Sequence, residues 1–265
     1  MNKQQTALIS GASSGIGEAL AKEFASAGTD LVLVARSESK LNQLADRLQK
    51  LHGVQVRVEP ADLTRRTAAK ALYSSLGEQG IDIDILVNNA GVLEQGRFVD
   101  IGGASLQRMI DLNISGLTAL LDRFLPPMLQ RGYGRVLNVA SIAAFQPVPS
   151  LATYAATKAY VLSLTESLAE ELRGSGVSIT ALCPGVTETN MVSNVREKNG
   201  SLSIPGFLIG DVEDVARQGY QACMKGEVIC VPGALNQAAT MTSGTLPRWL
   251  IRRIYGVMGR LTTGD

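Results

Sequence analysis

Histidine and cysteine are scarce in this sequence, which has one His and three Cys among its 265 residues. Cys183, Cys223 and Cys230 are an odd number of thiols without the spacing of a metal site. His52 is the single imidazole. A disulfide scaffold, a zinc site and a Ser-His-Asp hydrolase are therefore all disfavoured, and we expect no bound metal ion.

A net charge of either sign is also missing, because 25 Lys and Arg residues face 24 Asp and Glu residues. No global field attracts nucleic acid, so we expect no nucleic-acid partner. The sequence lacks an apolar run of about 18 residues, the length that suggests a membrane span. Residues 1–5 lead directly into a strand-like stretch. Together with the unpaired thiols, these features favour a reduced, cytoplasmic protein.

Short apolar runs alternate with helix-length segments along the chain. The runs are almost continuously apolar at their centres, which is typical of strands covered on both faces. The expected strands are residues 6–10, 30–35, 54–58, 84–88, 135–140, 178–183 and 228–231, and helices are expected at residues 17–27, 38–51 and 153–173, among others. This alternation predicts a single α/β domain over residues 1–265, with a Rossmann-like, doubly wound parallel sheet of about seven strands and helices on both faces.

Glycine is the residue type in excess, with 27 residues. Gly11, Gly15 and Gly17 join the first expected strand to the first helix. Their missing side chains would let a pyrophosphate approach the backbone and the helix N-terminus. A tight turn also needs glycine for conformational reasons alone, so this turn has a functional and a purely structural interpretation.

The residue after the second expected strand separates the two nicotinamide dinucleotides. An acid at this point would bind a ribose 2′-hydroxyl and repel a 2′-phosphate. Arg36 follows the strand instead, and its planar guanidinium suits phosphate, with Ser13, Ser14 and Ser37 as additional hydroxyl donors. This pattern favours NADP over NAD, the alternative being a solvated arginine at a strand end.

Tyr154 and Lys158 are four residues apart, so they share one face of a helix. A tyrosine has a pKa near 10, and a nearby ammonium together with an oxidised nicotinamide would favour the phenolate. Ser141 closes the fifth expected strand, where its hydroxyl could hold a substrate carbonyl. These three residues suggest proton exchange with an alcohol or a ketone.

An ordered series of motifs resembles that of the classical short-chain dehydrogenases/reductases. The motifs are residues 10–17 (SGASSGIG), residues 88–91 (NNAG), Asn113, Ser141, residues 154–158 (YAATK) and Pro184–Gly185. The resemblance spans residues 6–191, and the helix and strand that follow also fit. Ser10 stands where the family usually has threonine, a departure that keeps the hydroxyl. Residues after about Asn236 carry no family motif and inherit no role.

The resemblance implies a catalytic set and a cofactor site. The catalytic set is Asn113, Ser141, Tyr154 and Lys158. With the glycine turn and Arg36 included, the cofactor site is Gly11, Ser13, Ser14, Gly15, Ile16, Gly17, Arg36, Ser37, Asp62, Leu63, Asn89, Ala90, Gly91, Tyr154, Lys158, Pro184, Gly185, Thr187 and Thr189. Two alternatives stay open: Asp62 is also placed to cap a helix, and the Asn113 amide is also able to bond backbone groups instead of completing a proton relay with Lys158.

The loop between Ser141 and Tyr154 is mostly apolar, with two prolines and no Arg or Lys. A substrate lid is expected at about residues 190–210. We therefore expect an apolar ketone or secondary alcohol as substrate.

The C-terminal segment, residues 247–261, reads as a basic amphipathic helix. Packing on its own domain or on a second subunit is favoured over peripheral contact with a membrane. A homo-oligomer, dimer or tetramer, is expected from the resemblance, through helices around residues 111–129 and 154–172.

The function predicted from the sequence is hydride transfer between NADP(H) and a ketone or secondary alcohol. A non-catalytic nucleotide-sensing regulator and a membrane-surface scaffold are the alternatives on the same fold.

Overall fold

Seven parallel strands form one sheet in the computed structural model, which describes residues 4–187 and 210–245. The strand order is β3-β2-β1-β4-β5-β6-β7. The strands are β1 (Thr6–Ser10), β2 (Asp30–Ala35), β3 (Val56–Pro60), β4 (Ile85–Asn88), β5 (Gly134–Val139), β6 (Val177–Leu182) and β7 (Ile229–Cys230). The predicted seven-stranded parallel sheet is confirmed, although β7 is only two residues long.

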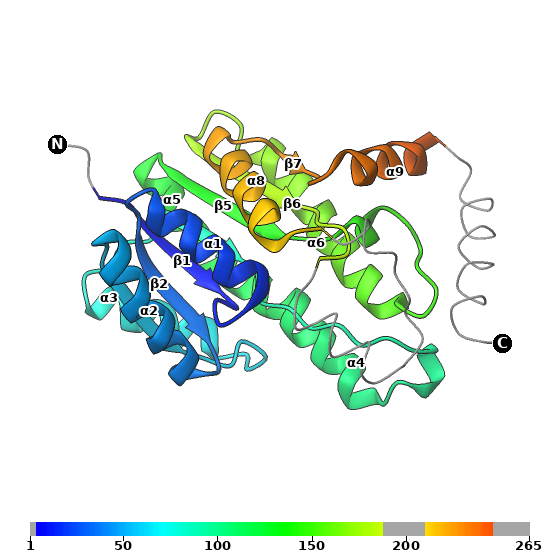
Figure 1. Ribbon diagram of the computed structural model, residues 1–265, viewed down its shortest axis with the longest axis horizontal. Coiled ribbons are helices and arrows are strands. Elements are labelled where there is room, and N and C mark those ends of the chain that lie inside the picture. The colour runs from blue at the N-terminus through cyan, green and yellow to red at the C-terminus, as the bar shows by residue number, and fades with distance from the viewer. Residues whose placement is uncertain (1–3, 188–209, 246–265) are drawn as a thin grey trace.

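Helices cover both faces of this sheet (Figure 1). The α-helices are α1 (Gly15–Ser26), α2 (Glu38–His52), α3 (Ala68–Glu78), α4 (Gly103–Ile110), α5 (Leu117–Arg131), α6 (Ala152–Glu171), α8 (Val212–Lys225) and α9 (Ala234–Thr245). Two short 3₁₀ turns, η1 (Phe98–Asp100) and η3 (Ile142–Phe145), lie in loops, and a π-helical turn, η2 (Asp111–Gly116), joins α4 to α5. The helices predicted at residues 17–27, 38–51 and 153–173 correspond to α1, α2 and α6.

Side chains point alternately to the two faces of each strand, and this explains why the core forms two layers, one on each face of the sheet. Ala7 and Ile9 of β1 pack in the cluster formed with α1, α2 and α8, whereas Leu8 packs in the cluster formed with α3, α5 and α6. Successive strand side chains point to opposite faces, so a continuously apolar strand supplies both layers. This is why the strands read as unbroken apolar runs in the sequence.

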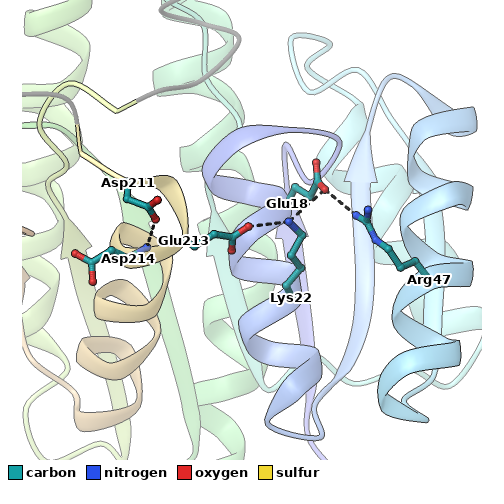
Figure 2. A network of polar contacts seen from close by, with 6 residues as sticks. All are labelled: Glu18, Lys22, Arg47, Asp211, Glu213 and Asp214. Atoms are coloured by element: carbon teal, nitrogen blue, oxygen red, sulfur yellow. Dashed lines mark hydrogen bonds and ion pairs between the residues drawn. The ribbon is translucent and has the colours of Figure 1, made fainter. Parts of the chain in front are cut away.

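Ion pairs link the three helices of one layer (Figure 2). Glu18 of α1 pairs with Arg47 of α2 at 2.7 Å, and Lys22 of α1 pairs with Glu213 of α8 at 2.8 Å. Asp211 accepts a hydrogen bond from the Asp214 amide at 2.9 Å and so caps α8. Exposed pairs of this kind contribute at most about 1 kcal/mol each, so apolar packing supplies most of the stability of the layer.

Two predicted segments lie outside the described residues. They are the lid at about residues 190–210, apart from Gly210 at its end, and the amphipathic helix at residues 247–261. The structure therefore does not test the predictions of a lid and of a C-terminal amphipathic helix.

Gly17 is the tightest point of the turn between β1 and α1. A Cβ atom built on it would lie 2.4 Å from the Gly11 carbonyl oxygen and 2.4 Å from Asn89 Nδ2. Gly77 is also helical, in α3, but a Cβ there would have nothing within 4 Å. The two glycines therefore differ in packing and not in secondary structure.

We predict that Gly17→Ala and Gly77→Ala change stability in opposite directions. Gly77→Ala should raise the free energy of unfolding by about 0.5–1 kcal/mol, because alanine restricts the unfolded chain. Gly17→Ala should lower it by about 2 kcal/mol or more, because backbone must move to admit the methyl group. Urea denaturation of both variants measures this, and equal effects would contradict the close packing at Gly17.

Candidate active site

A cleft of about 820 Å³ opens along the carboxyl edge of the sheet. The strand order reverses between β1 and β4, which is where ligands bind in sheets of this kind. The sequence-predicted site residues that line the cleft are Gly11, Ser13, Ser14, Gly15, Ile16, Arg36, Ser37, Asp62, Leu63, Asn89, Ala90, Gly91, Ser141, Tyr154, Lys158, Pro184, Gly185 and Thr187. Its volume is within the range of pockets that bind small molecules and cofactors.

Three predicted site residues are not in that lining. Gly17 is buried below the turn, where its lack of a side chain permits the packing described above. Asn113 lies behind the cleft and is 1% exposed. Thr189 lies outside the described residues.

The glycine turn exposes backbone to the cleft. Gly11 and Gly15 have φ values of 68° and 59°, in the left-handed region that side chains disfavour. Gly15 begins α1, and the first amide groups of a helix lack partners within the helix. A side-chain-free arc of backbone at a helix N-terminus fits the pyrophosphate of a dinucleotide.

Hydrogen bonds from Ser10 and Asn89 fix the ends of β1 and β4 to each other. The Ser10 hydroxyl donates to the Val87 carbonyl at 3.2 Å and accepts from the amides of Asn89 and Ala90, each at 3.0 Å. Asn89 Nδ2 donates to the Ser10 carbonyl at 2.9 Å. Ser10 therefore links the two strand ends through its hydroxyl, a group that the threonine usual at this position in the family also has.

Cationic and hydroxyl groups gather where β2 and β3 end. Arg36 is exposed and forms no ion pair or hydrogen bond with another described residue. Asp62 accepts hydrogen bonds from the Thr64 amide and hydroxyl, which lower its pKa, and the charge of Arg36 lowers it further. Asp62 thus closes a turn with Thr64 and does not cap α3, whose N-cap is Thr67. Lys40, which the sequence reasoning did not select, also lines the cleft, four residues after Arg36.

Ser141, Tyr154 and Lys158 converge beyond the ends of β5 and β6. The Ser141 hydroxyl lies close enough to Tyr154 to lower its pKa, donates to the Pro184 carbonyl at 3.5 Å and accepts the Ala143 amide at 3.1 Å. Lys158 lies one helical turn after Tyr154, with Nζ 5.8 Å from the centre of the tyrosine ring. Lys158 Nζ donates to the Val139 carbonyl at 2.8 Å, which fixes the ammonium at the end of β5.

Burial dominates the acid–base properties of this group. It raises the pKa of Tyr154 to about 12, against a smaller lowering by the Ser141 hydrogen bond. It lowers the pKa of Lys158 to about 8. The phenolate that the ammonium and an oxidised nicotinamide together were expected to favour is not the form that the protein alone stabilises, because desolvation of the phenolate dominates. At neutral pH Tyr154 keeps its proton.

The Asn113 side chain bonds to its neighbours. Its Oδ1 accepts the Val92 amide at 2.9 Å, and its Nδ2 donates to the Val92 carbonyl at 2.9 Å and to the Thr157 hydroxyl at 3.1 Å. This is the backbone-bonding alternative left open by the sequence. Asn113 lies within η2, so the helix predicted at residues 111–129 begins with a π turn. A water relay to Lys158 stays a prediction, and the second lone pair of Oδ1 is the part of this amide that could hold the water.

The loop between Ser141 and Tyr154 forms one wall of the cleft. It contributes Ile142, Ala143, Gln146, Val148 and Leu151. Arg108 of α4 also lines the cleft and is exposed. The loop is as apolar as predicted, but α4 adds a cation that inspection of the loop alone could not find.

Asn236 of α9 packs against Gly185 of the loop after β6. A Cβ atom on Gly185 would lie 2.6 Å from Asn236 Nδ2, and this amide donates to the Pro232 carbonyl at 2.7 Å. The segment after β7 therefore contacts the site, although it carries no family motif.

Two further findings concern the part of the chain that the structure describes. No helix in it is long and apolar enough to cross a membrane. It contains no group of His, Cys, Asp and Glu side chains arranged to hold a metal ion.

The doubly wound sheet, the glycine turn and the Ser-Tyr-Lys group define a dinucleotide-binding oxidoreductase fold and site. The sequence matches the short chain dehydrogenase family over residues 5–200. An uncharacterised oxidoreductase of Staphylococcus epidermidis is 36% identical over 189 residues, which are 71% of this chain and 80% of the relative. The chain belongs to the short-chain dehydrogenase family.

Solved structures agree with this assignment. A short-chain dehydrogenase from Sphingobium yanoikuyae in complex with NADPH is 34% identical, with a TM-score of 0.79 over 92% of this chain and 97% of that chain. A bulky-bulky ketone specific alcohol dehydrogenase from Comamonas testosteroni is 31% identical, with a TM-score of 0.77 over 93% and 96%. A family member from Burkholderia phymatum in complex with NAD is 26% identical, with a TM-score of 0.80 over 90% and 92%.

We predict that Lys158→Met stabilises the protein at neutral pH. A lowered lysine pKa means that the folded state disfavours the bound proton, at a cost of about 3 kcal/mol for a shift of this size. Loss of the hydrogen bond to Val139 offsets about 1 kcal/mol of the gain. We therefore expect the free energy of unfolding at pH 7 to rise by about 2 kcal/mol.

The sign of the pH dependence checks this prediction. The cost is fully present below pH 8 and disappears as the pH rises towards 10.5, the ordinary lysine value. The difference between the variant and the wild type should therefore shrink between these limits in guanidinium denaturation. A difference that stays constant with pH would mean that packing, and not the buried charge, separates the two proteins.

Proposed function

We propose that this protein transfers a hydride between NADP(H) and a ketone or secondary alcohol. The observation that carries the proposal is that one cleft is lined both by Ser141, Tyr154 and Lys158 and by Arg36, whose guanidinium has no hydrogen-bond or ion-pair partner among the described residues. A proton donor and a phosphate-binding cation in one cleft suit reduction by a phosphorylated dinucleotide. The experiment is to follow NADPH absorbance with a panel of ketones, and NADP⁺ with the matching alcohols.

The residues present fit a dinucleotide along the carboxyl edge of the sheet. The turn from Gly11 to Gly15 would hold the pyrophosphate, and Asp62 and Leu63 would border the adenine. Gly91 leaves space near the catalytic group, since a Cβ there would lie 3.5 Å from Lys158 Nζ. When bound, the cofactor would supply or accept the hydride.

Arg36 is the reason to prefer NADP over NAD. Structural neighbours bind either cofactor, so the fold does not decide between them. Arg36 occupies the position after β2 where an acid would repel a 2′-phosphate, and its donors have no described partner. Lys40, one helical turn away, adds to the positive potential in this part of the cleft.

Tyr154 would be the proton donor in the direction of ketone reduction. Its raised pKa keeps the phenol protonated at neutral pH, which is the form that protonates a developing alkoxide. The Ser141 hydroxyl is placed to bind the same substrate oxygen, and Lys158 to restore the proton. Asn113 would act as a positioning residue, because it anchors the segment after β4 to α6 through Val92 and Thr157.

The apolar loop supports an apolar ketone or secondary alcohol as substrate. A nucleotide-sensing regulator or a membrane-surface scaffold would not need Ser141, Tyr154 and Lys158 together in one cleft. A homo-oligomer remains our expectation, and the exposed apolar residues Leu129 and Tyr160 on the expected helices are consistent with it. Cytoplasmic location also stays a prediction.

We predict that Tyr154→Phe lowers turnover by about a hundredfold or more while NADPH still binds, because the change removes the transferable proton and leaves the ring. Tyr160→Phe is the matched control: Tyr160 lies on the same helix, is half-exposed and bonds to Thr118 at 2.9 Å. Steady-state rates and NADPH fluorescence titration measure the two effects. Near-normal turnover by Tyr154→Phe would remove Tyr154 from its proposed role.

We predict that Arg36→Ala raises the KM for NADPH about tenfold and leaves the KM for NADH nearly unchanged, because the guanidinium contacts only the 2′-phosphate. Arg47→Ala removes a cation from the same helix region, one that pairs with Glu18, and serves as the control. Both constants come from initial rates with each cofactor. Equal losses on NADPH and NADH would mean that Arg36 supports the fold and does not discriminate between the cofactors.

A further inference from the structure

We infer that Gln146 selects substrates that carry a second, neutral hydrogen-bonding group, a hydroxyl or carbonyl, at a distance from the reacting carbonyl. This inference rests on the proposed function, since it concerns the substrate of the same cleft. It narrows the expected apolar ketone to a ketone with one additional polar group.

Gln146 is the polar exception on an apolar wall. Together, η3 and the loop that follows it contribute five residues to the cleft. Apart from Gln146, these are the apolar residues Ile142, Ala143, Val148 and Leu151. Val92, Leu93 and Val186 line the cleft from neighbouring segments. A glutamine among aliphatic side chains offers two amide donors and one carbonyl acceptor.

The Gln146 amide is not used by the fold. It makes no hydrogen bond to another residue of the described chain, whereas the polar side chains nearby do. Ser141 contacts Tyr154 and the Ala143 amide, and Asn113 is held by Val92 and Thr157. Gln146 is therefore the amide in this wall that is available to a ligand.

The loop that carries Gln146 is held in place. The Ser150 carbonyl accepts a hydrogen bond from the Gly96 amide at 2.9 Å, and the Leu151 amide donates to the Val148 carbonyl at 3.1 Å. Ser150 has a φ of 63° and is the one non-glycine residue with positive φ in the described chain. Pro147 and Pro149 restrict the backbone further. The fold has thus already fixed the backbone that carries Gln146 before any ligand binds, and only the side chain has still to be ordered.

Desolvation makes this amide selective. An aliphatic substrate that covers Gln146 takes away its water and gives no hydrogen bond in return. A substrate with a matching hydroxyl or carbonyl replaces the lost bond, and sites of this type reject the analogue that lacks the group. Gln146 is uncharged and its own loop has no Lys or Arg, so a neutral group is favoured beside it; a carboxylate would instead bind at Arg108 of α4, the cation that α4 contributes to the cleft.

The experiment compares matched ketones with the full-length protein and NADPH. The substrates are 2-decanone and its isomeric hydroxy derivatives, with the hydroxyl moved along the chain. The wild type should prefer one hydroxyketone over 2-decanone by about tenfold in kcat/KM, mostly through KM. Gln146→Leu should abolish this preference without lowering the rate on 2-decanone.

Three variants complete the design. Gln43→Leu changes an exposed glutamine on α2 and should behave as wild type. Gln146→Met serves if the leucine variant unfolds. Arg108→Ala tests the other polar group of the cleft wall. An unchanged preference in Gln146→Leu, or a preference lost only in Arg108→Ala, would overturn the inference.

A binding readout separates this inference from the proposed function. The melting temperature is measured with 2-decanol and with each matching diol, in the presence of NADPH. Stabilisation by one diol that depends on Gln146 supports the inference even without turnover, in which case only the proposed reaction fails. Turnover of the ketones with no dependence on Gln146 leaves the reaction intact and overturns the inference. Absence of both turnover and binding overturns both.

Discussion

The hydrogen bonds between the ends of β1 and β4 are the constraint on which the site depends. At this junction the connection that follows β1 leads towards β2, and the connection that follows β4 leads towards β5, so the segments leaving the two strand ends diverge and leave a crevice between them. Ser10 and Asn89 hold the two strand ends together, and the residues that follow them, Gly11, Ala90 and Gly91, line the cleft. The glycine turn on one side and the segment leading to Asn113 on the other both take their positions from these bonds.

Lys158 places a charged ammonium in a buried position, which the apolar core around it disfavours. The residue is 5% exposed, and its ammonium has one backbone carbonyl as its described hydrogen-bond partner. A buried charge with so little compensation lowers stability, and apolar packing in the two helix layers must offset it. Tyr154 is neutral at pH 7, so its burial carries no such cost and keeps it in the protonated form. Protein stability and proton chemistry are therefore opposed at Lys158.

The sheet could be predicted because strands that are buried on both faces appear in the sequence as unbroken apolar runs. The glycine and Tyr-Lys motifs could be predicted because they depend only on spacing along the chain. Other features depend on distances between segments that are remote in sequence. Arg108 and Lys40 reach the cleft from helices whose faces the motifs do not specify. The raised pKa of Tyr154 follows from burial, which sequence spacing cannot measure. The bonds of Asn113 to Val92 and Thr157 needed the fold itself.

The contact between Asn236 and Gly185 has a consequence for chimeric proteins. The family match ends at residue 200, so the segment after β7 lies outside it and is a natural unit to exchange when new substrate ranges are sought. In this chain the short amide of Asn236 fills the space that a glycine leaves beside the cleft. A transplanted segment with a larger side chain there would push on the loop that begins at Pro184, so residues 185 and 236 have to be exchanged as a pair.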